Sequence, residues 1–250
     1  MQHRPERWEL FVLALILSAF AAVLVSLAWK TGVTIDEPAH VLSAHLYWIG
    51  EDNLAAGDMP PAIKILGGWV SHLAGLPIPR DNPAVWSTQH EWPISLEMMS
   101  RMSHAQIHNV FFYSRLPLLV FPLACALLVW YWGRQLFSPI TALLMMGVFS
   151  LSPTVLGHGC LFKNDLAASF SYLLFWYCAW RFWKEPQLRQ AVFLAVALLI
   201  AILAKFSLLI LVPLAPAIIL VRCFTLRPIP YRLAALSLLV LFLVPYAGVL

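Results

Sequence analysis

Three acidic residues lie at the boundaries of long apolar segments, where acidic side chains are rare unless they do chemistry. Asp36 and Glu37 follow the first segment of membrane-spanning length, and Asp165 lies at the junction between the third and the fourth. A carboxylate is costly at a bilayer boundary, and it can accept a proton from a reacting group. Because both positions are expected on the same outer face of a membrane, they predict a reaction centre there.

The composition predicts that membrane-spanning helices hold these residues. Of the 250 residues, 61% are hydrophobic and 11% are charged, and the mean hydropathy is +0.80. These values exclude a soluble domain of this length and predict an all-α polytopic membrane protein. The net charge of +4 is attributed to the loops, so no nucleic-acid partner is expected. The four cysteines are scattered without CxxC spacing, which argues against a disulfide framework and a zinc ribbon.

Seven apolar runs are expected to be spans, the first of them a retained anchor and not a cleaved signal peptide. They cover residues 8–29, 116–132, 139–156, 166–183, 191–203, 206–221 and 233–250. A single helix over 191–221 would be about 45 Å long, against a hydrocarbon core of about 30 Å. We therefore predict a turn at Lys205, which separates two short helices.

This division also gives the orientation that the positive-inside rule prefers, with the N-terminus in the cytoplasm. The basic residues around positions 4–7, 134, 181–189 and 222–232 are then cytoplasmic. The loop 30–115, the turn around 158–165 and Lys205 are then outside. In that outer loop, apolar residues recur at helical spacing over 38–49 and 61–73, which predicts amphipathic helices lying in the membrane interface.

Several short segments, taken in order, resemble a known family. They are Thr-Ile-Asp-Glu-Pro-Ala-His at 34–40, Asp-Met-Pro-Pro-Ala-Ile-Lys at 58–64, Tyr-Ser-Arg-Leu-Pro at 113–117, Ser-Pro, His-Gly and Asn-Asp within 152–165, and Ala-Lys-Phe at 204–206. Together they resemble the N-terminal half of GT-C glycosyltransferases, nearest to the protein O-mannosyltransferase and aminoarabinose transferase group. The family usually has His or Lys before the Pro-Pro pair and Thr before the second Asp, whereas this chain has Met59 and Asn164. These departures affect metal or phosphate contacts near Met59 more than they affect the reaction class.

The resemblance implies a GT-C transmembrane helix bundle that uses a polyprenyl-phosphate sugar as donor. The expected acceptor is a hydroxyl group of a protein or a lipid, and the expected location is the bacterial inner membrane, with the active site extracytoplasmic. Family members are normally longer, so we expect a C-terminal part of the bundle beyond Leu250.

Transfer of a sugar from a lipid phosphate needs a base for the acceptor hydroxyl and positive charge for the departing phosphate. Asp36 is the predicted general base, and it can also be the N-cap of a helix that has Pro38 in its first turn. Glu37 is expected to tune the charge of the site or to order the loop, with simple solvation as the alternative. Asp165 is expected to position a substrate, and capping of the following helix is its alternative.

Three outer cations, Lys64, Arg115 and Lys205, are predicted to bind the donor phosphate. Each can instead anchor the chain at lipid headgroups, although Lys205 is the strongest candidate because it interrupts an apolar run. Asp58 matches a position where some relatives place an acidic metal ligand, so a divalent metal is a possible cofactor there. His104 and His108 have the spacing of metal ligands on a helix, but without a third ligand a structural role is favoured.

The sequence therefore predicts an inverting membrane glycosyltransferase. The alternatives are a transporter or flippase of lipid-linked substrates and a noncatalytic membrane scaffold. A transporter should carry charges in the middle of its spans, whereas Asp36, Asp165 and Lys205 are all predicted at one face.

Overall fold

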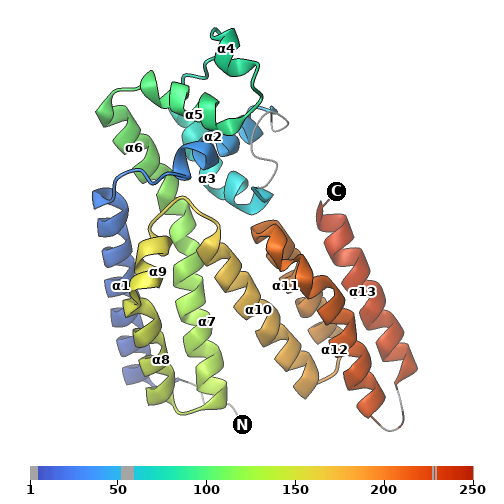
Figure 1. The fold of residues 1–250 in the computed structure, drawn as a ribbon. Helices are drawn as coiled ribbons and strands as arrows, with labels where there is room; N and C mark the ends of the chain where they lie inside the picture. Colours follow the sequence, from blue (N-terminus) through green and yellow to red (C-terminus); the bar gives the residue numbers. More distant parts are fainter. Residues whose placement is uncertain (1–4, 52–58, 227, 229, 250) are drawn as a thin grey trace. The chain divides into compact units, whose positions relative to one another are not determined.

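The computed structural model describes residues 5–51, 59–226, 228 and 230–249, and every regular element in these ranges is a helix (Figure 1). In chain order they are α1 (Arg7–Lys30), α2 (Glu37–Trp48), α3 (Pro61–Ala74), α4 (Pro83–Trp86), α5 (Glu91–Ser100), α6 (His104–Arg115), η2 (Leu116–Leu119), α7 (Val120–Leu136), α8 (Pro139–Leu151), α9 (Pro153–Gly159), α10 (Asp165–Lys184), α11 (Leu188–Ala204), η3 (Phe206–Ile210), α12 (Leu211–Thr225) and α13 (Tyr231–Val249). The protein is an all-α polytopic membrane protein, as the composition predicts.

The chain forms two compact units, residues 1–167 and 168–250, and the division falls inside α10. In the first unit, α1, α7, α8 and α9 pack around a core that includes Phe20, Leu24 and Met146 (Figure 1). In the second unit, α11, α12 and α13 pack around a core that includes Phe182 and Leu211.

Three helical segments among the described residues are long and apolar enough to cross a membrane. They are Arg7–Lys30, the continuous stretch His104–Leu136 and Phe206–Thr225. Leu188–Ala204 and Tyr231–Ala247 are shorter apolar helices. The predicted number of seven spans stays a prediction.

The predicted span 139–156 is a pair of helices, α8 and α9, that meet at an angle of 60°. Ser152 separates them and has an extended backbone conformation, and Pro153 begins the second helix. Proline has no N–H group to continue the hydrogen bonds of the preceding helix, which explains a break at this point.

A second break falls at Lys205, where the sequence predicts a turn. The residue is extended, with φ −160° and ψ 128°, and it lies between the end of α11 and the 3₁₀ turn η3 that leads into α12. Both η3 and α12 contact α11, so the chain folds back on α11 at this break.

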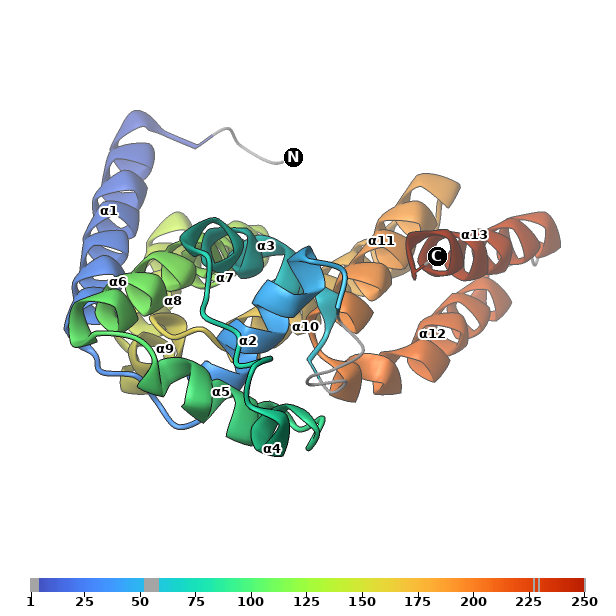
Figure 2. The same ribbon diagram turned by 90° about the horizontal axis from the view of Figure 1, so that it is seen from above.

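Helices α2 to α6 form a small helical layer at one end of the first unit. Figure 1 shows α4 and α5 at the same end as α2, and α5 contacts α2 (Figure 2). Helices α2 and α3 cross closely because Gly68 has no side chain: a Cβ atom there would lie 2.5 Å from the carbonyl oxygen of Ala44. Gly75 ends α3 in the left-handed conformation, with φ +65°, which glycine adopts without steric cost.

Candidate active site

A buried ion pair between Glu37 and Arg115 lies where α1, α2 and α6 meet. Arg115 donates from Nε to one carboxylate oxygen of Glu37 at 2.8 Å and from Nη2 to the other at 2.7 Å. Its remaining N–H groups donate to the carbonyl oxygens of Ala28, Thr31 and Gly32 at 2.8 to 2.9 Å. All five donors of the guanidinium group are therefore used within the protein. The sequence predicts Arg115 as a phosphate ligand, whereas here it fixes the end of α1 to the start of α2.

Glu37 is completely buried and also holds two loops. Its carboxylate accepts hydrogen bonds from the backbone N–H of Phe162 at 2.7 Å and from the N–H and hydroxyl of Thr34 at 2.9 and 3.1 Å. Burial alone would raise the pKa of Glu37, but the hydrogen bonds and charge of Arg115, with the backbone donors, hold it below its usual value. Of the roles predicted for Glu37, these contacts match the ordering of the loop.

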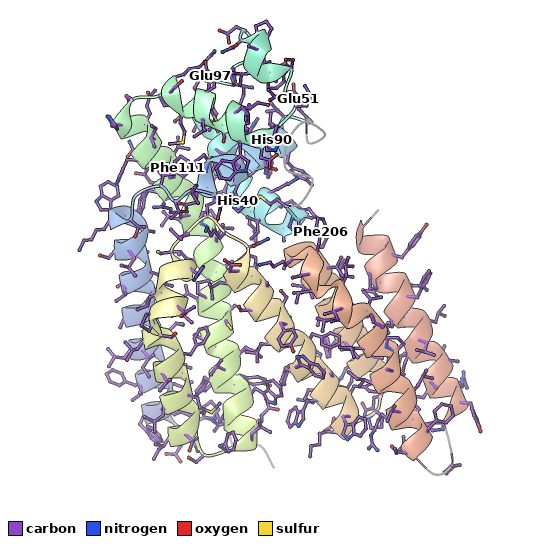
Figure 3. All side chains as sticks on the ribbon, viewed as in Figure 1. His40, Glu51, His90, Glu97, Phe111 and Phe206 are labelled. Carbon is purple, nitrogen blue, oxygen red and sulfur yellow. The ribbon has the colours of Figure 1, made fainter. Side chains whose placement is uncertain are left out.

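The connection between α9 and α10 is attached to this layer through Phe162. Its N–H donates to Glu37, and its carbonyl oxygen lies 3.2 Å from Nδ1 of His40. Figure 3 labels His40, which lies where α2 meets this connection. The Phe162 ring packs on Gly67 of α3 so closely that a Cβ atom on Gly67 would lie 2.2 Å from the ring. Backbone and side chain thus both fix the segment that precedes Asp165.

Asp36 forms an ion pair with Lys163 of this connection. Asp36 occupies the N-cap position of α2, but its side chain makes no capping hydrogen bond. Instead, Nζ of Lys163 donates to its Oδ2 at 2.8 Å. The Asp36 side chain is 44% exposed and that of Lys163 is 17% exposed, so the pair is accessible from outside the protein. Sequence reasoning missed Lys163, although its place in the predicted outer turn 158–165 was a usable signal.

Asp165 begins α10, two residues after Lys163. Its Oδ2 lies 3.2 Å from Nδ1 of His158, and both side chains are partly exposed. The first unit therefore brings Asp36, Lys163, His158 and Asp165 to the connection between α9 and α10.

Of the remaining predicted residues, two lie at other elements and one lies outside the described ranges. Lys64, on α3, is 3% exposed, an unusual burial for an ammonium group. Lys205 belongs to the second unit, so its phosphate role stays a prediction. Asp58, the predicted metal ligand, lies outside the described residues. Within those residues, no group of three or more His, Cys, Asp or Glu side chains is placed to hold a metal ion.

The histidines at helical spacing have a structural contact. Ser103 and Gln106 form a capping box that starts α6 at His104. One turn later, Nε2 of His108 lies 3.0 Å from the carbonyl oxygen of Trp29, and the two rings meet edge to face. His108 thus joins α6 to the end of α1.

Comparison with known families identifies the chain. The model of the dolichyl-phosphate-mannose-protein mannosyltransferase family matches residues 93–246, which is more than half of the sequence. The chain belongs to this family. It is accordingly a membrane glycosyltransferase of the GT-C type. The match includes Arg115, Lys163, Asp165 and Lys205, whereas Asp36 and Glu37 precede it. A search of curated proteins found no match.

Proposed function

We propose that the protein transfers a sugar from a polyprenyl-phosphate donor to a hydroxyl group of a protein or lipid acceptor, with Asp36 as general base. The observation that supports this most is the state of the Asp36 carboxylate. It is 44% exposed, makes no capping bond, and has an ammonium group 2.8 Å away. A base must reach the acceptor, and an accessible carboxylate on a fixed helix start meets that need.

The proposed reaction is one displacement with inversion. The acceptor oxygen forms a bond to the anomeric carbon, and its proton passes to Asp36. The bond from the anomeric carbon to the phosphate oxygen breaks, and its electron pair leaves with the phosphate. Asp165 is proposed to position a substrate, and Lys64 and Lys205 stay candidates for the departing phosphate. Positive charge at that oxygen lowers the barrier because negative charge develops there in the transition state.

The substitution Asp36→Asn tests the base. Asparagine keeps the size of the side chain, and α2 loses no capping bond because Asp36 makes none. We expect sugar transfer to slow by about 10² to 10⁴, the usual contribution of general-base assistance, with little change in thermal stability. Asp81→Asn is the matched control, since Asp81 is a more exposed aspartate of the same predicted outer loop. Full transfer activity in Asp36→Asn would reject the assignment of the base.

We further propose that the site faces the outside of a bacterial inner membrane and that the N-terminus is cytoplasmic. Single cysteines can test this, because all four native cysteines are buried and should react slowly. Ser87→Cys and Gln187→Cys place thiols at two exposed positions on predicted opposite sides. A membrane-impermeant thiol reagent should label Ser87→Cys in intact cells and leave Gln187→Cys unlabelled. The reverse pattern would overturn the orientation.

A further inference from the structure

We propose that Lys163 is the cation that binds the donor phosphate beside Asp36. This inference rests on the proposed function, and it assigns a residue that the sequence motifs do not single out. It follows from a comparison of the hydrogen-bond donors of Lys163 with those of Arg115 and from the contacts that hold the loop of Lys163.

Lys163 has donors to offer, whereas Arg115 has none. The guanidinium group of Arg115 is 2% exposed and directs all five N–H groups to Glu37 and to backbone carbonyl oxygens. Recruiting it to a phosphate would leave Glu37 buried and without its counter-charge. The Lys163 ammonium has three donors and gives one to Asp36, so two can reach phosphate oxygens.

The position of Lys163 is held by its neighbour in the chain. Phe162 is fixed by its N–H to Glu37, by its carbonyl oxygen near His40 and by its ring against Gly67. Little freedom remains for the Lys163 backbone, while its long side chain can still move between partners. A flexible ammonium on a fixed backbone suits a phosphate whose charge changes during the reaction.

The ion pair with Asp36 gives this arrangement a chemical advantage. In the resting protein, the Lys163 ammonium neutralises the Asp36 carboxylate. As the acceptor proton moves to Asp36, the carboxylate loses its charge while the departing phosphate gains one. The attraction between Lys163 and Asp36 therefore weakens while the attraction between Lys163 and the leaving phosphate grows. The contact with the phosphate is thus stronger in the transition state than in the ground state.

Binding of lipids with and without a phosphate tests the inference. Dolichyl phosphate and dolichol serve as probes, each titrated into the purified protein in detergent. Lys163→Met should weaken binding of dolichyl phosphate by roughly ten- to a hundred-fold, the effect of losing one charge-assisted hydrogen bond, and leave dolichol binding unchanged. Lys163→Arg keeps the charge and should stay within a few-fold of the wild type. Lys30→Met, at an exposed lysine that ends α1, is the control and should bind both lipids normally.

Each outcome bears on the inference separately from the proposed function. Equal binding of the two lipids by the wild type would overturn it, as would normal affinity for dolichyl phosphate in Lys163→Met. A lower kcat in Lys163→Met together with unchanged binding of dolichyl phosphate would place Lys163 on Asp36 alone and would also overturn it. Failure of the wild type to transfer sugar would reject the proposed function, while the binding comparison would still report on Lys163.

Discussion

The buried ion pair predicts that Glu37→Gln is among the most destabilising conservative substitutions in the helical layer of the first unit. Glu37 accepts five hydrogen bonds, two from Arg115, two from Thr34 and one from Phe162. Three of these donors point at Oε2 and two at Oε1. Whichever way the amide of glutamine turns, its NH₂ group faces at least two N–H donors, one of them from Arg115. The arginine also keeps a buried charge without a counter-charge.

Removing one partner of a buried ion pair costs about 3–5 kcal/mol, far more than breaking a surface pair. For a chain of this size, each kcal/mol lowers the midpoint of thermal unfolding by about 2–4 °C, so a fall on the order of 10 °C is expected. Glu97→Gln is the matched control, because Glu97 pairs with Arg101 through partly exposed side chains. That pair should contribute about 0–1 kcal/mol.

Thermal unfolding of the purified protein in detergent, followed by tryptophan fluorescence, measures both variants. The reasoning is refuted if Glu37→Gln lowers the midpoint no more than Glu97→Gln does.

Two further predictions concern the same layer. The folded-state pKa of Glu37 lies below its usual value near 4.5. The stability that this carboxylate contributes should therefore be complete above pH 4.5 and should be lost as the pH falls through the lower folded-state pKa. As the pH falls below 4.5, the unfolding midpoint should drop less steeply in Glu37→Gln than in the wild type. Gly67→Ala places a methyl group against the Phe162 ring and should cost about 1–3 kcal/mol in unfolding free energy. Gly147→Ala meets no atom within 4 Å and should be neutral or slightly stabilising, so equal midpoints for the two alanine variants would contradict the packing argument.

Much of the architecture could be predicted from the sequence, because it follows from local properties. Hydrophobic runs longer than a few helical turns predict membrane helices regardless of what they pack against. The break at Lys205 was predictable because a charged residue interrupts a stretch too long for one span. The 60° bend before Pro153 was missed, although a proline within an apolar run is a signal for such a break.

The sequence by itself determined which residue types stand at the ends of the apolar segments, and so it located Asp36, Glu37 and Asp165. Only the tertiary structure decided their partners. Glu37 and Arg115 are 78 positions apart in the chain, and Asp36 and Lys163 are 127 apart. Such pairings depend on how the helices pack, for which a single sequence has no local signal. The same packing made Arg115 the buried counter-charge of Glu37 and brought Lys163 to the carboxylate of Asp36.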